Sequence, residues 1–173
     1  MYPSITVTIP KEILSDKIVQ DSIALVMVKK TAPETKFLFK KTVFGWANKP
    51  SFRQKLTRRA HYMSMYVYAS GTNADQYALV NAGADPHVIT PIGKGYPLKF
   101  KWGGKGSYKA SSSPRIIQSK RHYKTGPVRT FMSVNHPGFP AREFDQAIAE
   151  EYAPTFRKDI QDAIGVAAAK SNK

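Results

Sequence analysis

The side chains that most often carry out chemistry are thinly spread along this chain. Its four histidines are scattered, and none has acidic residues around it at metal-ligand spacing: His61, His87, His122 and His136. The carboxylate nearest to a histidine is Asp85, beside His87, in a common turn arrangement. Cysteine is absent, which excludes thiolate nucleophiles, zinc ribbons and iron–sulfur clusters. We therefore expect no metal site, no cofactor and no histidine-based catalysis.

Two glycine-rich segments, 93–95 and 103–107, superficially look like phosphate-binding loops. Neither has the Gly-x-x-x-x-Gly-Lys-Ser/Thr spacing, and neither precedes a helix whose N-terminus could hold an anion. No serine lies in a Gly-x-Ser-x-Gly elbow, and the middle of the chain has too few acids for paired-carboxylate catalysis. We expect a protein without enzymatic activity. A hydrolase or nuclease is disfavoured by the same lack of clustered carboxylates.

Positive charge is concentrated in the middle of the chain. The 173 residues include 27 lysines and arginines against 12 acids, a net charge of +15. No acid occurs in 35–74 or in 86–142, and these two windows hold 19 of the 27 bases, whereas 143–173 has six acids and four bases. This segregation indicates a polyanionic partner or an acidic protein surface. A solvated basic face without a specific partner is the simpler alternative.

One basic stretch is interleaved with aromatic residues and is the leading candidate for an interaction site. Its basic members are Lys99, Lys101, Lys105, Lys109, Arg115, Lys120, Arg121, Lys124 and Arg129, with Trp102, Tyr108 and Tyr123 among them. Lysine and arginine can neutralise phosphates, and tyrosine can stack on an exposed base. The same stretch could instead reach over an acidic neighbouring subunit. Both interpretations stay open on the sequence alone.

The elements that position these residues predict a single domain over residues 1–173, of α+β class. Its length and its 42% hydrophobic content suffice for one core. A strand is expected at Ser4–Ile9, followed by a helix from Pro10 to about Lys30 that Pro33 ends. Further strands are expected over 36–44, 52–56, 60–69, 76–81, 96–102 and 128–134. No apolar run is long enough for a membrane span.

Two other segments complete the expected fold. Residues 103–127 have low hydrophobicity and predict a protruding basic arm, either a hairpin or a flexible loop. The segment after Phe144 has apolar residues at helical spacing, with Pro154 expected to kink or divide the helix. The predicted architecture is thus an N-terminal and a C-terminal helix packed on a mainly antiparallel sheet, with the arm projecting from it.

Two short motifs are more specific than the charge pattern. Residues 83–91 read Gly-Ala-Asp-Pro-His-Val-Ile-Thr-Pro and lead to Leu98-Lys99-Phe100, while 134–138 read Val-Asn-His-Pro-Gly and lead to Phe144. In this order, with a basic stretch between them, they resemble the neck and tail-completion proteins of long-tailed bacteriophages, also described as head–tail joining or minor tail proteins. The resemblance covers about residues 77–170. Ala84 departs from it, because the family's usual residue there is threonine.

The resemblance implies a virion structural protein at the phage head–tail interface. Such a protein forms a homo-oligomeric ring around the DNA channel and joins the capsid connector to the tail. Its expected partners are copies of itself, connector or stopper proteins and tail-tube proteins, with non-specific contact to genomic DNA and no membrane. Its expected location is the neck or head-proximal tail of the virion, assembled in the host cytoplasm. A tail terminator ring that caps the tail tube is the nearest alternative.

The residue types in the two motifs agree with a structural role. Glycine permits backbone angles that other residues avoid, and proline stiffens turns. We expect the histidines to form hydrogen bonds within turns. The proposed structural residues are Gly83, Pro86, His87, Pro91, His136, Pro137, Gly138 and Phe144.

A function of another class remains open beside the phage resemblance. The net charge of +15 and the basic run also fit a stand-alone nucleic-acid-binding or ribosome-associated protein. That interpretation requires tight, steeply salt-dependent binding by the monomer. It is weakened by a C-terminal quarter that is not basic.

Overall fold

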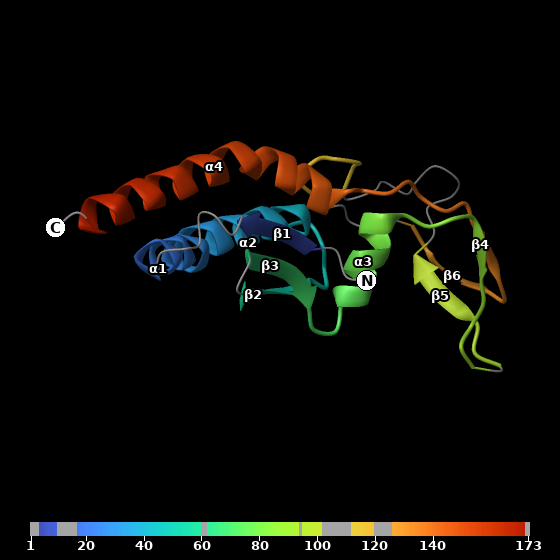
Figure 1. The fold of residues 1–173 in the computed structure, drawn as a ribbon. Helices are drawn as coiled ribbons and strands as arrows, with labels where there is room; N and C mark the ends of the chain where they lie inside the picture. The colour runs from blue at the N-terminus through green and yellow to red at the C-terminus, as the bar shows by residue number, and fades with distance from the viewer. Residues whose placement is uncertain are drawn as a thin grey trace.

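The computed structural model describes residues 4–9, 17–59, 62–93, 95–101, 112–119 and 126–171. The fold is α+β, as the sequence predicts. Helices pack on a three-stranded sheet to form a body, and two small β-ribbons project from one end of this body as an extension (Figure 1).

The sheet of the body consists of β1 (Ser4–Ile9), β2 (Ser51–Arg59) and β3 (Tyr62–Ser70), in the antiparallel order β1-β3-β2. β1 and β3 lie where the sequence predicts strands, whereas β2 extends on both sides of the strand predicted at 52–56 and continues to Arg59. Alternate residues of β3 point into the core, and each of these side chains is at most 2% exposed: Met63, Met65, Val67 and Ala69. Since side chains alternate along a strand, the other residues of β3 lie on the opposite face of the sheet.

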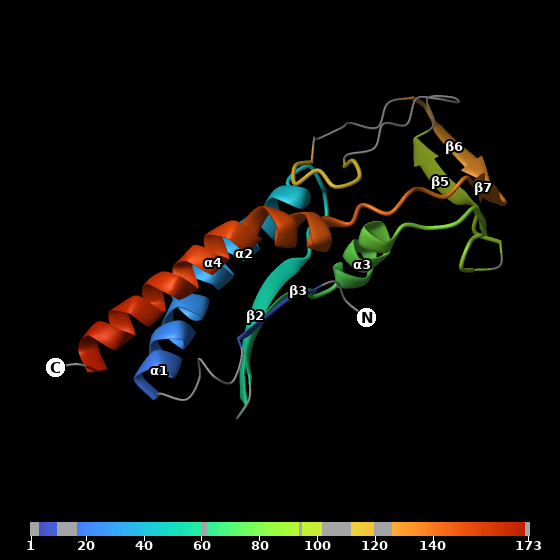
Figure 2. The ribbon, with the colours of Figure 1, turned by 45° about the horizontal axis from the view of Figure 1, so that its top comes forward.

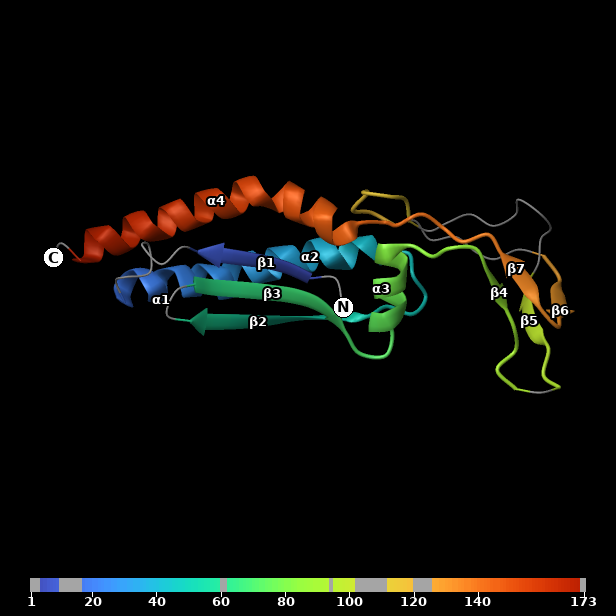
Figure 3. The same ribbon diagram turned by 45° about the vertical axis from the view of Figure 1, so that its right-hand side comes forward.

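A continuous helical segment covers the inner face of this sheet (Figure 3). It comprises α1 (Lys17–Val26), the π-helical turn η2 (Met27–Thr31) and α2 (Ala32–Thr42). The predicted stop at Pro33 is wrong, because Pro33 lies in the first turn of α2, directly after the π turn. A π turn rearranges the local hydrogen bonds, and the first turn of a helix tolerates the missing N–H of proline.

The strand expected at 36–44 is also wrong, since α2 continues to Thr42. Thr35, Phe39 and Thr42 are buried. Their spacing of four and three residues is that of one helix face, so a helix buries them together and a strand would not.

The strand expected at 76–81 is a helix as well, α3 (Ala74–Ala82). It buries Ala74 and Tyr77 and ends at Gly83, whose φ of 83° is in the left-handed region that glycine adopts without strain. Residues 71–73 form the turn that connects β3 to this helix.

The C-terminal helix α4 (Phe144–Ser171) has 28 residues and lies along α1 and α2 (Figure 2). Pro154 lies inside the helix without dividing it. Its buried face contributes Phe144, Ile148, Ile160 and Ala163 to the core. None of the described helices is long and apolar enough to cross a membrane.

Four short strands form the extension. β4 (His87–Ile89) pairs with β7 (Val134–His136), and β5 (Leu98–Lys101) pairs with β6 (Val128–Phe131), both antiparallel. The strand predicted at 128–134 is therefore split between β6 and β7, which pair with different partners. None of the described apolar side chains of the extension belongs to the buried core.

Candidate interaction surfaces

The two sequence motifs meet at the base of the extension. Residues of the first motif pair with residues of the second, with His87 opposite His136 and Ile89 opposite Val134. Nearer the body, the backbones of Ala84 and Phe139 exchange two hydrogen bonds, of 3.0 and 2.8 Å between nitrogen and oxygen. The motifs are about fifty residues apart in the chain, so the fold is what makes them one structural unit.

The motif glycines allow the two backbones to come this close. Gly83 has a φ of 83°, and a Cβ atom added to it would lie 2.6 Å from the backbone nitrogen of Ala141. Gly138 has a φ of 75°, and its added Cβ would collide with the carbonyl oxygen of Ala84. Each position therefore requires glycine for two reasons: the backbone angle is left-handed, and there is no space for a Cβ atom.

The two histidines of the motifs make local hydrogen bonds, as expected for turn residues. The Nδ1 of His87 lies 2.7 Å from the carbonyl oxygen of Asp85, and the backbone N–H of Gly138 donates to the Nδ1 of His136 over 3.1 Å. The rings of His87 and His136 stack with centroids 5.0 Å apart. Among the described residues, no group of histidine, aspartate and glutamate side chains could hold a metal ion.

The side chain of Asn81, near the end of α3, joins this helix to the start of α4. Its Oδ1 accepts a hydrogen bond of 2.7 Å from the backbone N–H of Phe144, and its Nδ2 donates to Asp145 over 2.9 Å. Phe144 is fully buried and stacks on Tyr77, with ring centroids 5.7 Å apart. Phe144 is therefore a core residue, whereas Pro86 and Pro137 are exposed and Pro91 is partly exposed.

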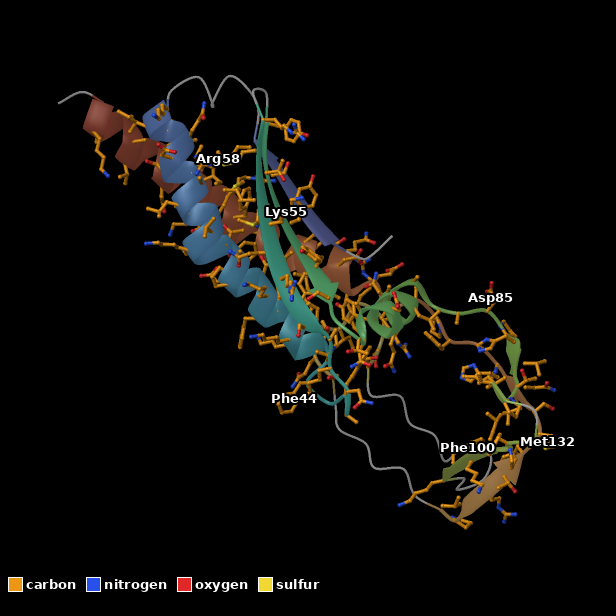
Figure 4. All side chains as sticks on the ribbon, turned by 90° about the horizontal axis from the view of Figure 1, so that it is seen from below. Phe44, Lys55, Arg58, Asp85, Phe100 and Met132 are labelled. Carbon is orange, nitrogen blue, oxygen red and sulfur yellow. The ribbon has the colours of Figure 1, made fainter. Side chains whose placement is uncertain are left out.

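The outer ribbon of the extension carries basic and apolar side chains on a surface without acids. Lys99 and Lys101 are exposed on one face of β5, while Leu98 and Phe100 lie on the other. Arg129 is paired with Phe100, which places it on the face opposite the two lysines. Figure 4 shows Phe100 and Met132 together at this far end of the molecule.

Apolar side chains are exposed over the whole extension. Ile92 and Tyr96 lie in the connection between β4 and β5, and Tyr96 is 78% exposed. Val88, Val128 and Met132 are each between 59% and 68% exposed. So many exposed apolar side chains on a small projection are typical of a contact surface for another macromolecule.

The predicted arm at 103–127 does not protrude in its described part, residues 112–119. Ser112 and Ser119 are 8% and 3% exposed. The backbone N–H of Gly45 donates to the Oγ of Ser119 over 2.7 Å, and Ile117 packs against the core. This prediction is therefore wrong for 112–119, which is held on the body by contacts with residues distant in the chain.

Arg115 belongs to this docked segment and forms ion pairs with acidic residues of its own chain. It forms an ion pair of 3.1 Å with Glu143 and a second ion pair with Glu150. The hydrogen bond and the charge of Arg115 lower the pKa of Glu150. Five other predicted arm residues lie outside the described residues: Lys105, Lys109, Lys120, Arg121 and Lys124.

A groove of the body combines apolar and acidic side chains. It lies between α2 and α4 and has a volume of about 540 Å³. Its lining consists of Pro33, Glu34, Phe37, Leu38, Glu151, Tyr152 and Thr155. The ring of Phe37 is 58% exposed there. The groove therefore differs in charge from the acid-free extension.

A second basic surface, outside the predicted basic stretch, lies on the outer face of the body sheet. Cross-strand pairs there join Arg53 to Tyr68, Lys55 to Tyr66 and Arg59 to Tyr62. The alternation of Arg53 and Lys55 within the strand predicted at 52–56 indicates part of this surface, but Arg59 lies beyond the predicted strand.

No protein-family model, curated protein or solved structure matches this chain.

Proposed function

We propose that this protein is a structural component of a bacteriophage head–tail interface, without catalytic activity. In this role it forms a ring of identical subunits that joins the capsid connector to the tail around the DNA channel. The observation that carries the proposal is the pairing of the two family-like motifs at the base of the extension, with His87 opposite His136. A pair of motifs that builds the base of a projecting contact element is what an assembly protein needs.

A closed ring requires a heterologous interface, in which two different patches of the subunit meet. The extension and the α2–α4 groove are suitable patches. The ribbons of the extension beyond Asp85 have exposed lysines and apolar side chains and no acid, while the groove has Glu34, Glu151 and the exposed ring of Phe37. We infer that the extension of one subunit contacts the groove of the next.

Charge reversal tests this contact. Lys99→Glu combined with Lys101→Glu should weaken oligomers in analytical ultracentrifugation, and Glu34→Lys with Glu151→Lys should do the same. The four changes together should restore assembly, because opposite charges again face each other. Lys29→Glu with Lys170→Glu, two exposed helix positions outside both patches, is the matched control. Assembly that is unaffected by either reversal contradicts the proposed contact.

The role in the virion is tested by electron microscopy of a lysate in which the gene is silenced. Filled heads and separate tails support a joining role. Heads that carry overlong, irregular tails support the alternative role of a tail terminator ring. Normal particles contradict both.

Deletion of residues 104–126 would be a poor test of the arm. It would remove Arg115, Ile117 and Ser119, which pack on the body, so a loss of assembly could result from damage to the fold. Substitution of Ile92, Tyr96 and Met132 by serine perturbs exposed extension residues without removing core contacts.

A further inference from the structure

The outer face of the β1-β3-β2 sheet lies on the side of the strands away from the helices. Arg58 of β2 points to the helices, where it donates a 2.9 Å hydrogen bond to Asp21 of α1. Lys55, three residues earlier in the same strand, must lie on the other face. Figure 4 shows the two side chains on opposite sides of the strand. Among the described elements, none packs across this outer face (Figure 3).

The outer face places cations and aromatic rings in two parallel rows. β2 contributes Arg53, Lys55 and Arg59, all exposed, and β3 contributes three tyrosines opposite them: Tyr68, Tyr66 and Tyr62. Thr57 and Ser64 complete the pairing between the second and third of these pairs. We call these eight residues the tyrosine–basic face. Neither β2 nor β3 contains an acidic residue, and none occurs anywhere in 35–74.

The spacing of these side chains matches a linear polyanion. Residues two apart in a strand are about 6.8 Å apart, so Arg53 and Lys55 present neighbouring charges along the edge strand β2. Tyrosine rings beside them offer flat apolar surfaces on which bases can stack, and hydroxyl groups that can donate to phosphate oxygens. Similar combinations of cations and aromatic rings on open sheets are used to bind nucleic acids.

Charge decides between the possible occupants of the face. A second copy of the same face would bring like charges together, which is unfavourable. A phosphodiester chain is compatible with every side chain of the two rows. Ser64, at 1% exposure, is covered by its neighbours, so the side chains available to such a chain are the exposed basic residues of β2 and the tyrosines of β3.

We propose that the tyrosine–basic face binds the phosphodiester backbone of a nucleic acid. Arg53, Lys55 and Arg59 neutralise phosphates, and Tyr62, Tyr66 and Tyr68 contact sugars or unpaired bases. The inference stands on the sheet alone and does not rest on the proposed ring. Within a head–tail joint, it would assign DNA contact to this face and leave the extension for protein contacts.

The test measures binding of the full chain to a fluorescein-labelled 20-nucleotide single strand and to its duplex, by anisotropy at several salt concentrations. In Arg53→Gln/Lys55→Gln/Arg59→Gln, the slope of log K against log salt should become shallower by about 2 for the single strand and about 3 for the duplex. The control Lys29→Gln/Lys40→Gln/Lys158→Gln removes the same charge from exposed helix positions and should keep most of the slope.

Two further comparisons distinguish binding by the tyrosine–basic face from a non-specific effect of the net positive charge. Arg53→Gln should weaken binding more than Arg58→Gln, although both remove one arginine from the same strand. Tyr66→Leu with Tyr68→Leu should lower single-strand affinity about tenfold or more if bases stack, with little effect on the duplex. If the tyrosine variant loses affinity for the single strand but not for the duplex, bases stack on the tyrosines. If only the triple Arg/Lys variant loses affinity, and loses it equally for the single strand and the duplex, the face binds the phosphate backbone. Either result supports the proposal.

Three outcomes overturn the proposal. The first is no binding of either nucleic acid by the wild-type chain. The second is equal binding by the triple variant and its helix control, with both variants folded by circular dichroism. The third is binding of polyglutamate as tightly as nucleic acid, which would indicate an acidic protein surface as the partner. Measurements at concentrations where the chain is monomeric keep these outcomes separate from any failure of ring assembly.

Discussion

His87 and His136 occupy directly opposed positions of β4 and β7, and their imidazole rings stack at an interplanar angle of 26°. The ring of His136 also meets Phe139 edge-on, with centroids 6.1 Å apart. His136 thus links three features of the extension base: the strand pair, the turn at Gly138 and the aromatic contact.

Substitution of His136 separates its hydrogen bond from its ring contacts. His136→Phe keeps an aromatic ring but cannot accept the N–H of Gly138, so we expect the free energy of opening of the β4–β7 pair to fall by about 1 kcal/mol. His136→Ala loses both contributions and should cost about 2 kcal/mol. Hydrogen exchange of the strand amides measures both values. Equal costs for the two variants would show that the ring contacts contribute nothing, and no cost for His136→Phe would show that the hydrogen bond contributes nothing.

Gly138→Ala should disrupt the close approach of the two motifs. The added methyl group collides with the backbone of Ala84, and the left-handed φ adds strain, so we expect a loss of about 3 kcal/mol in local stability. Gly71→Ala is the matched control, because Gly71 has a φ of 85° with open space around it. It should cost only about 1 kcal/mol. Chemical denaturation and hydrogen exchange distinguish the two, and similar losses would contradict the steric argument.

The ion pair between Arg115 and Glu150 should make the docking of residues 112–119 depend on pH. The lowered pKa of Glu150 means that its contact with Arg115 stabilises the docked 112–119 segment above the ordinary pKa of glutamate. This stabilisation is lost as the pH falls through the lowered value. In Arg115→Gln, the carboxyl titration of Glu150, followed by NMR, should move up toward the ordinary range. An unchanged titration midpoint would show that Arg115 does not hold Glu150 in solution.

The burial of Tyr77 makes the stability of the protein depend on pH in the alkaline range. Burial raises the pKa of this fully buried tyrosine, so the folded state keeps a proton that the unfolded state releases. Stability from this group is complete below the ordinary tyrosine pKa of about 10 and declines above it by roughly 1.4 kcal/mol per pH unit.

Tyr77→Phe tests this response. Its hydroxyl makes only a 3.4 Å contact with Thr42, so stability near neutral pH should change by less than about 1 kcal/mol. Above pH 10 the decline should be shallower than in the wild type, because the tyrosine proton is gone. Tyr96→Phe, at an exposed position, should leave the decline unchanged. Urea denaturation at several pH values measures the difference.

The parts of the fold that the sequence predicts well are those with unambiguous local patterns. Ser4–Ile9 alternates polar and apolar residues, and 60–69 is rich in residues that favour strands, so β1 and β3 were expected. The C-terminal helix was expected from its apolar spacing. The short apolar runs at 36–44 and 76–81 fit the period of a strand as well as that of a helix, so the local sequence does not decide between them. The choice depends on which face of the segment the rest of the core covers.

The docking of 112–119 could not be predicted from local sequence. Its position depends on contacts between Ser119 and Gly45 and between Arg115 and Glu143, which are distant along the chain. Low hydrophobicity is typical of both a free arm and a segment held by polar contacts. By contrast, the pairing of the two motifs agrees with their expected structural role, and the tyrosine–basic face follows from strand alternation once the register of β2 and β3 is known.

The attachment of the extension also has a mechanical consequence. A pull on the ribbons would pass through the Ala84–Phe139 bridge to Asn81, and from its side chain to the first turn of α4. There the force would meet Phe144 stacked on Tyr77, in the most buried part of the core. A subunit pulled by its neighbours would thus transmit tension through hydrogen bonds into the buried aromatic core of the body.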